Sequence, residues 1–213
     1  MTNQLSTPIE NKNQLVQYFI DGIKEYNNLR IGVEHEKFLF NKEGLKRIDF
    51  NQLKKVFEIL NDKGWKPELE KDKVIGLKRD NQKITTEPGF QYELSGAPFK
   101  NIHSVCSENS NHFDELKKVF SLIGITTSSI AYDPFNKLNE IPKSPKERYK
   151  IMTSEMPKGG ELSLDMMYKT AGIQINYDYT SEEDFEKKFK IGNYLVPLAI
   201  AIFANSPFNE NKL

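Results

Sequence analysis

Cysteine is nearly absent from this sequence, and so are long apolar segments. Cys106 is the single cysteine in 213 residues, which excludes an intrachain disulfide and a zinc site built from several thiolates. Its place on the apolar stripe of an expected helix predicts a buried core thiol. The longest apolar run, residues 194–204, has about half the length of a bilayer span and contains Pro197. We therefore expect a buried helix here and no membrane partner.

Signals for export are also missing. Residues 1–14 are polar and contain neither an arginine nor an apolar core, which argues against a signal peptide or a transit peptide. A lone cysteine is typical of proteins kept in a reducing compartment. From these two absences we expect a cytoplasmic location.

Neither sign of charge predominates. Lys+Arg and Asp+Glu number 30 each, so the composition gives no reason to expect a nucleic acid or an anionic membrane as partner. What the sequence does contain is 14 Phe and 9 Tyr within an apolar content of 38%. This content and the chain length predict one packed domain, with two small domains as the less favoured alternative. Motifs of serine and cysteine hydrolases, P-loops and GxGxxG nucleotide sites do not occur.

Hydrophobic spacing predicts a mixture of helices and antiparallel strands. Capping signatures at residues 7–10 and 144–147 predict helix starts. Further helices are predicted over about 50–60, 102–123 and 180–204, a hairpin within 73–93, and strands over 30–40, 161–165 and 171–179, whereas residues 65–67 are expected to end the second helical segment. We expect an α+β fold, an antiparallel sheet with helices packed on one face.

The segment 30–40 places two carboxylates on one side of a strand. Alternation puts Glu34 and Glu36 on the face that also carries Phe38, while His35 points the other way. Like charges this close repel each other unless a cation lies between them, and Mg²⁺ prefers such hard oxygen ligands. A solvated edge with Lys or Arg partners is the alternative, and this strand alone favours it.

Two other segments carry polar side chains that are able to join this face. Glu87 and Glu93 bracket residues 88–92, although a turn residue before proline is an equal alternative for Glu87. Gln174 and Asn176 share the polar side of the last strand, which suits metal ligation or nucleotide contact but equally a wet outer face, and this strand taken singly favours the wet face. Together the three segments predict an acidic sheet face that binds several Mg²⁺ ions and the phosphates of ATP.

Two basic residues are candidate partners for anions. Lys78 lies near the hairpin turn and is available to a phosphate, and Arg148 on the short helix after residue 147 is able to hold a carboxylate bidentately. An idle surface lysine and a surface ion pair are the ordinary alternatives.

Six segments resemble one enzyme family in the same order along the chain. They are residues 31–38 (IGVEHEKF), 86–98 (TEPGFQYELSGAP), 145–152 (PKERYKIM), 164–167 (LDMM), 172–176 (GIQIN) and 203–208 (FANSPF). These segments resemble the plant and α-proteobacterial class of glutamate–cysteine ligases. Members of that class are much longer, so the resemblance implies that residues 1–213 are the N-terminal part of a single catalytic domain and that the C-terminal half of the family is absent.

The resemblance implies a fold and a reaction. The fold is the glutamine-synthetase-like carboxylate–amine ligase fold, here incomplete, with a six-stranded sheet that forms a funnel. The reaction is ATP-dependent ligation of the glutamate γ-carboxylate to the cysteine amine through an acyl phosphate, the first step of glutathione biosynthesis. It requires Mg²⁺, and the full-length protein is expected to be a monomer or homodimer. An inactive fragment or binding module of the same fold, and a ligase with another amine acceptor, are the alternatives.

The resemblance also implies roles for single residues. Glu34, Glu36 and Glu93 match Mg²⁺-binding positions, and Glu87 and Gln174 are weaker matches to the same metal cluster. Tyr149, Met152, Thr170 and Asn176 are expected at the substrate or nucleotide, and Arg148 and Lys169 are expected to be catalytic. Lys78 is added to the nucleotide-binding residues from its place near the hairpin turn, since it lies outside the six matching segments. Phe90 departs from the family, which usually has a glycine there, a residue that permits close backbone approach or a positive φ.

Overall fold

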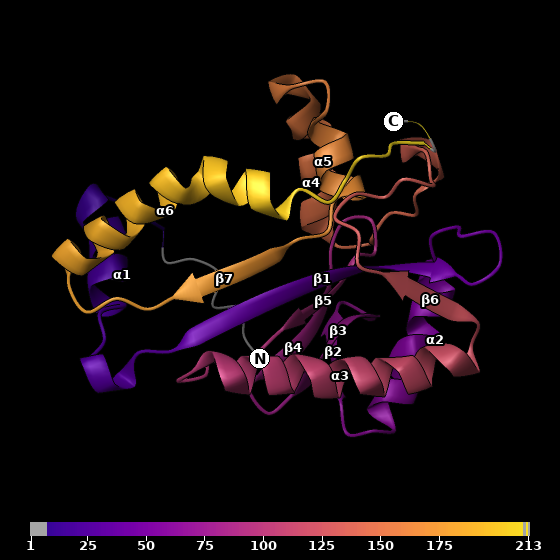
Figure 1. Ribbon diagram of the computed structural model, residues 1–213, viewed down its shortest axis with the longest axis horizontal. Helices are drawn as coiled ribbons and strands as arrows, with labels where there is room; N and C mark the ends of the chain where they lie inside the picture. Colours follow the sequence, from indigo (N-terminus) through magenta and orange to yellow (C-terminus); the bar gives the residue numbers. More distant parts are fainter. Residues whose placement is uncertain (1–7, 211, 213) are drawn as a thin grey trace. The chain divides into compact units, whose positions relative to one another are not determined.

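The structure, a computed structural model, describes residues 8–210 and 212 and has an α+β fold (Figure 1). The chain divides into two compact units. The helical unit comprises the residues up to Ile31 together with Asn176–Ala204, and the sheet unit comprises Gly32–Ile175 together with Asn205–Leu213.

The sheet follows the strand order β2-β3-β4-β5-β1-β6, and β7 pairs with β1 off this path. The strands are β1 (Ile31–Asn41), β2 (Lys66–Glu70), β3 (Lys73–Arg79), β4 (Gln82–Thr86), β5 (Tyr92–Ser95), β6 (Ile125–Ser128) and β7 (Ile173–Tyr177). All pairings along the path are antiparallel. The sheet among the described residues thus has one strand more than the six that the resemblance implies.

The predicted hairpin is confirmed as β3 and β4. Leu77 lies opposite Ile84, and both side chains are fully buried. Asp80 in the connecting turn has a φ of 51°, a left-handed conformation that Asp tolerates better than most residues. Alternation along β3 and β4 therefore gives the sheet one buried face and one open face.

The helices are α1 (Lys12–Asp21), α2 (Phe50–Asn61), α3 (Ile102–Leu122), α4 (Glu147–Glu155), α5 (Ser163–Lys169) and α6 (Glu182–Phe203), with short 3-10 helices η1 (Tyr26–Asn28), η2 (Leu138–Glu140) and η3 (Met156–Gly159). Two of these helices, α2 and α3, cover the buried face of the sheet. Leu53 of α2 and Leu116 of α3 share one core with Leu39 of β1. Phe38, the neighbour of Leu39, belongs to a separate cluster with Phe40 and Ala171. Helices on one face of an antiparallel sheet are what the sequence predicts.

The start of the first helix differs from the prediction. Helix α1 begins at Lys12, and the side chain of Asn11 caps it by accepting a hydrogen bond from the Gln14 N–H. Pro8 and Glu10 are not helical, and Thr7 lies outside the described residues. The cap predicted at Ser144 is also wrong, because α4 starts only at Glu147 and no side chain caps it.

Residues 66–70 and 161–165 differ from their predicted secondary structure, each for an identifiable reason. Residues 66–70 form the edge strand β2, and an edge position tolerates Pro67, which has no N–H to donate. The predicted strand over 161–165 is replaced by helix α5. Met167 and Tyr168 of α5 pack into a small core with Ile141 and Tyr149, so tertiary packing decides the conformation of this short segment.

Burial was overpredicted in three places. Cys106 is exposed. Helix α6 forms as predicted but contains no buried residue. Ile173, Ile175 and Tyr177, the apolar side of β7, are 62%, 50% and 63% exposed. Apolar periodicity identified the elements, but nothing in the part of the chain that the structure describes covers these faces. No described helix is both long and apolar enough to cross a bilayer.

The helical unit is held by contacts between its two chain segments. Phe185 of α6 packs against Phe19 of α1 and against Tyr179, with ring centroids 5.8 and 5.1 Å apart. Asp178 accepts hydrogen bonds from the Lys24 ammonium at 2.6 Å and from the Arg30 N–H at 2.8 Å. The carboxylate of Asp178 therefore serves to join the segments of this unit.

Candidate functional site

Glutamates from neighbouring strands meet on the open face of the sheet. Glu36 of β1 is the direct partner of Glu93 on β5, and Glu34 lies opposite Ser95. Directly opposed side chains have their Cβ atoms about 4.5–5.5 Å apart on the same face. Glu87 follows β4 immediately. We call Glu34, Glu36, Glu87 and Glu93 the glutamate cluster.

The glutamate cluster is electrostatically coupled. Burial raises the pKa of Glu36, the Gly172 N–H opposes this shift, and the charges of the other three glutamates raise the pKa further. Burial likewise raises the pKa of Glu87, with the charge of Glu93 as the next cause. Like charges held this close favour protonation or the binding of a cation.

Neutral donors fix the two opposed carboxylates. Glu93 accepts hydrogen bonds from the hydroxyls of Thr85 at 3.0 Å and Ser95 at 2.7 Å. Glu36 accepts one from the Gly172 N–H at 2.8 Å. Among the described residues neither carboxylate forms an ion pair with lysine or arginine. Both are therefore oriented without being neutralised.

Glu87 is held differently, by the start of α4. Its carboxylate accepts a hydrogen bond from the Tyr149 hydroxyl at 3.1 Å and lies 3.6 Å from the Arg148 guanidinium. Arg148 also donates to the Tyr149 hydroxyl at 2.6 Å. The Lys146 ammonium donates to the Thr86 carbonyl at 2.8 Å. Lys146 and Arg148 thus place positive charge at one border of the cluster, and Lys146 was not among the predicted site residues.

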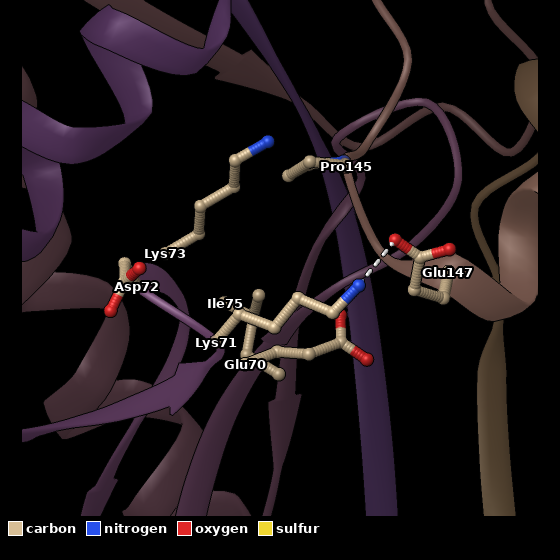
Figure 2. Close-up of a pocket in the computed structure, with 7 residues that line it drawn as sticks. All are labelled: Glu70, Lys71, Asp72, Lys73, Ile75, Pro145 and Glu147. Carbon is tan, nitrogen blue, oxygen red and sulfur yellow. Dashed lines mark hydrogen bonds and ion pairs between the residues drawn. The ribbon is translucent and has the colours of Figure 1, made fainter.

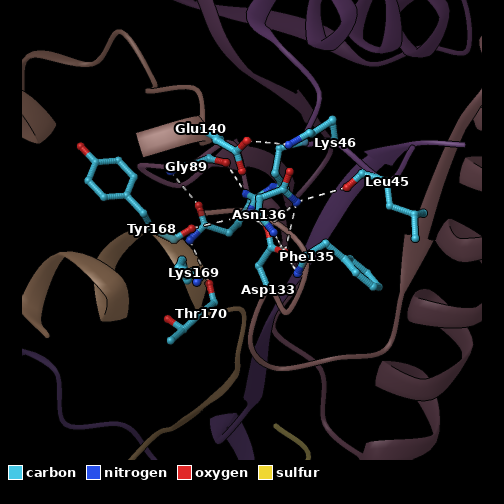
Figure 3. A network of polar contacts seen from close by, with 12 residues as sticks. Leu45, Lys46, Gly89, Asp133, Phe135, Asn136, Glu140, Tyr168, Lys169 and Thr170 are labelled. Carbon is cyan, nitrogen blue, oxygen red and sulfur yellow. Dashed lines mark hydrogen bonds and ion pairs between the residues drawn. The ribbon is translucent and has the colours of Figure 1, made fainter. Parts of the chain in front are cut away.

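Gly89, two residues after Glu87, belongs to a polar network that also contains Asp133 and Asn136 (Figure 3). Arg47 donates to the Gly89 carbonyl and forms an ion pair with Asp133 at 3.3 Å. Asp133 also accepts from the Asn136 N–H at 3.1 Å. Gln91 donates to the carbonyls of Met167 and Thr170. None of these roles has a local sequence signal, because each depends on which segments meet in the fold.

The backbone conformation and the packing of Phe90 account for its departure from the family's usual glycine. Its φ is +57°, in the left-handed region that glycine enters freely. The ring is buried and stacks on Phe50 with centroids 6.0 Å apart. The turn thus keeps the backbone conformation that a glycine permits, and ring burial offsets the strain.

This conformation gives a testable order of stabilities. A left-handed non-glycine residue costs about 1–2 kcal/mol, so the Phe90→Gly variant is expected to be more stable than Phe90→Ala by about 1 kcal/mol. Within helices and strands, by contrast, glycine normally lowers stability relative to alanine. Urea unfolding of both variants measures the difference, and a more stable alanine variant would contradict a left-handed residue 90.

The other predicted site residues lie apart from the cluster or at its edge. The Lys169 side chain is fully buried, and its ammonium donates to Asn209 at 2.6 Å. The Thr170 hydroxyl donates to the Met166 carbonyl at 2.6 Å. Met152 is 37% exposed on α4. The structure does not bring Lys169 and Thr170 to the glutamates by any contact.

Residues of the outer strands complete the comparison with the prediction. Gln174 is exposed on β7, two positions after Gly172, whose N–H binds Glu36. Asn176 is exposed on β7 and belongs to the helical unit. Lys78 is exposed on β3, directly opposite Lys83. Gln174 and Lys78 thus lie in the sheet unit, on strands that flank the cluster.

A cavity of about 220 Å³ opens between the β2–β3 turn and the start of α4 (Figure 2). Its lining residues are Glu70, Lys71, Asp72, Lys73, Ile75, Pro145 and Glu147. Lys71 and Glu147 face each other across it in an ion pair of 3.0 Å. Charges of both signs line this cavity, so it has no clear preference for an anion or a cation.

The carboxylates fit a divalent cation by donor type but not as a complete cage. No group of three His, Cys, Asp or Glu side chains among the residues described lies close enough to hold a metal ion. Mg²⁺ usually takes one or two carboxylates and completes its octahedron with water and substrate phosphates. The opposed pair Glu36 and Glu93 suits that mode.

Comparisons with known proteins agree on the family. Residues 30–212 match the model of glutamate–cysteine ligase family 2. The chain is 44% identical over 210 residues to glutamate–cysteine ligase A, chloroplastic, of Oryza sativa subsp. japonica, covering 98% of this chain and 42% of the relative. It is 42% identical over 202 residues to glutamate–cysteine ligase, chloroplastic, of Arabidopsis thaliana, covering 94% and 39%.

These relatives correct one prediction and set a limit. Their names place them in the chloroplast, which contradicts the expected cytoplasmic location. A lone cysteine indicates reducing conditions, and such conditions are not specific to the cytoplasm. The chain spans 42% of the length of the first relative and 40% of that from Medicago truncatula. With the family model matched over residues 30–212, the chain belongs to glutamate–cysteine ligase family 2.

Proposed function

We propose that this chain forms part of an ATP-dependent ligase that joins the γ-carboxylate of glutamate to the amine of cysteine, the first step of glutathione biosynthesis. The observation that carries the proposal is the glutamate cluster, in which Glu36 and Glu93 oppose each other on neighbouring strands without a lysine or arginine partner in the described chain. Family membership supplies the reaction class, because the relatives are named as glutamate–cysteine ligases.

Glu36 and Glu93 are the residues that we expect to hold Mg²⁺, with Glu34 beside them and Gln174 as a weaker candidate. The bound ion would neutralise the phosphates of ATP and the charge that develops as phosphate moves to the glutamate γ-carboxylate. Thr85 and Ser95 both donate to one oxygen of the Glu93 carboxylate through their hydroxyls, which fixes the orientation of this carboxylate. Mg²⁺ rather than another divalent ion is part of this proposal.

Arg148 is the candidate for a substrate carboxylate. Its side chain is 63% exposed although it lies 3.6 Å from Glu87, so one edge of the planar guanidinium is accessible. A guanidinium binds a carboxylate with two parallel hydrogen bonds. We assign Glu87 mainly to holding Arg148 and Tyr149, and only secondarily to the metal. The acyl phosphate of glutamate, attacked by the amine of cysteine, would form between Arg148 and the cluster.

Nucleotide binding tests the proposal. Isothermal titration of the chain with MgATP is expected to give binding that the Glu36→Gln variant weakens at least tenfold, because one of the two opposed carboxylates is lost. The matched control is Glu58→Gln, an exposed glutamate of α2, which should bind like the wild type. Equal affinity of Glu36→Gln and wild type would remove the metal role of the cluster.

Turnover separates binding from catalysis. Release of ADP in the presence of glutamate, cysteine and Mg²⁺ is expected to be very low for the 213 residues alone, since more than half of the length of the relatives lies outside the match. Robust turnover by these 213 residues would contradict this expectation, because it would require a complete site within this chain.

A further inference from the structure

Three lysines form a row across the open face of the sheet. Lys66 of β2 lies opposite Lys78 of β3, and Lys78 lies opposite Lys83 of β4. All three are exposed. Directly opposed like charges destabilise a sheet, so this arrangement has a cost in the unliganded protein. We call these residues the lysine row.

The lysine row continues into the glutamate cluster. Lys83 is the direct partner of Ser95 on β5, and Ser95 is the direct partner of Glu34 on β1. Directly opposed residues share a face, so the row and Glu34 lie on the same side of the sheet. At about 4.8 Å per strand, Lys83 is about 10 Å from Glu34 along this line.

Few carboxylates neutralise the lysine row. Lys83 lies 3.7 Å from Glu68, whereas Lys66 and Lys78 form no ion pair with any described residue. The cavity between the β2–β3 turn and α4 differs in this respect, because one of its two lysines, Lys71, is paired with Glu147 and the carboxylates of Glu70 and Asp72 also line it. The row is therefore the stronger candidate for an anionic ligand.

We propose that the lysine row binds the polyphosphate chain of a nucleotide whose metal ion is held at the glutamate cluster. This inference rests on the proposed function and names a subsite for its nucleotide. Lysine acts towards phosphate as a strongly hydrated point charge on a flexible stem, and ammonium groups on adjacent strands match a chain of charged phosphates. The metal-binding carboxylates and the lysines lie side by side on one face, so a single extended anion reaches both.

The test is titration with inorganic tripolyphosphate at low salt, without a divalent ion, and then with MgATP. The variant Lys78→Gln/Lys83→Gln is expected to bind tripolyphosphate at least tenfold more weakly than the wild type. The matched control, Lys54→Gln/Lys55→Gln, removes two neighbouring exposed lysines of α2, on the covered side of the sheet, and should bind within twofold of the wild type.

Thermal melting is the second measurement, and its first part needs no ligand. Because the opposed lysines repel each other, Lys78→Gln/Lys83→Gln is expected to melt at a higher temperature than the wild type without ligand. Tripolyphosphate should raise the melting temperature of the wild type and of the Lys54→Gln/Lys55→Gln control, but not that of Lys78→Gln/Lys83→Gln. Equal tripolyphosphate affinity in both double variants, or none in the wild type, overturns the inference.

The two probes separate this inference from the ligase proposal. If tripolyphosphate binds through the lysine row while MgATP does not bind, the row is an anion site and the ligase proposal fails. If MgATP binds the wild type and the Lys78→Gln/Lys83→Gln variant equally, the lysine row is refuted and the ligase proposal is unaffected.

Discussion

Replacing Arg47 by methionine is expected to lower the free energy of unfolding by about 3–5 kcal/mol. The side chains of Arg47 and Asp133 are 1% and 0% exposed and lie 3.3 Å apart. Burial lowers the pKa of Arg47, and the charge of Asp133 opposes this shift. Without the guanidinium, a carboxylate remains in the protein interior with no cation, which accounts for the size of the expected loss.

A double-mutant cycle distinguishes the lost ion pair from lost packing. The guanidinium lies over the Phe38 ring at 4.4 Å, so part of the effect of Arg47→Met is packing. Asn at position 133 keeps an oxygen for the Phe135 and Asn136 N–H groups while removing the charge. Arg47→Met/Asp133→Asn should therefore be more stable than the sum of the two single losses predicts.

Arg79 provides the matched control. It also forms an ion pair with a carboxylate, Glu115 at 3.0 Å, and lies over the Trp65 ring at 4.2 Å, but its side chain is 31% exposed. Arg79→Met is therefore expected to lose about 1 kcal/mol, in line with partly exposed pairs. Guanidinium chloride unfolding of all variants measures these differences. A loss of under 1 kcal/mol for Arg47→Met would show that the buried pair contributes little.

Replacing Lys37 by methionine should have the opposite effect, a gain of about 3 kcal/mol at pH 7. Lys37 is 7% exposed, and its ammonium has no hydrogen-bond partner among the described residues. Burial lowers the pKa of Lys37 from 10.5 to about 8, and each pKa unit corresponds to about 1.4 kcal/mol. Methionine fills a similar volume without a charge.

The pH dependence of this gain has a definite sign. Between pH 8 and 10.5 the unfolded chain binds more protons at Lys37 than the folded chain does, so the Lys37 contribution to wild-type stability rises with pH in this window. The advantage of Lys37→Met should therefore shrink from about 3 kcal/mol at pH 7 towards zero near pH 10.5. Urea unfolding at both pH values measures it, with Lys54→Met, an exposed lysine of α2, as the control.

Two histidines report on the same substitution. Burial lowers the pKa values of His35 and His112, and the charge of Lys37 lowers both further. Removing that charge should raise both pKa values, which NMR titration of the ring protons measures. Unchanged histidine pKa values together with unchanged stability would show that the Lys37 side chain reaches solvent.

Much of the sheet unit was predictable because its signals are local. Residues 30–40 were predicted as a strand and form β1, although their apolar residues do not alternate cleanly, and the apolar spacing of Leu53, Val56 and Leu60 predicted α2, which also has the expected buried side. The segment that became α5 was not predictable from periodicity, because Met167 and Tyr168 are buried by partners distant in sequence. Whether a periodic face is covered is likewise a property of the whole protein, as the exposed α6 shows.

The candidate site was predictable in composition but not in register. The sequence placed Glu34 and Glu36 on one face, but it could not show that Glu36 faces Glu93 rather than Ser95, since a shift of the β1–β5 pairing changes every partner. The roles of Arg47, Asp133 and Lys146 were missed, because an ion pair or a hydrogen bond between segments far apart in the sequence produces no periodic pattern of residues. The roles of the predicted ligands remain predictions.

The uncovered helix α6 has a practical consequence for handling the purified chain. Tyr194, Ile200 and Phe203 are 81%, 67% and 77% exposed, and apolar surface of this extent drives molecules together as concentration rises. At micromolar concentration the chains should associate with one another and adsorb to glass. Both effects should be stronger in sulfate, which strengthens apolar association. Measurements on unassociated chains should therefore use dilute samples at low salt with a mild detergent.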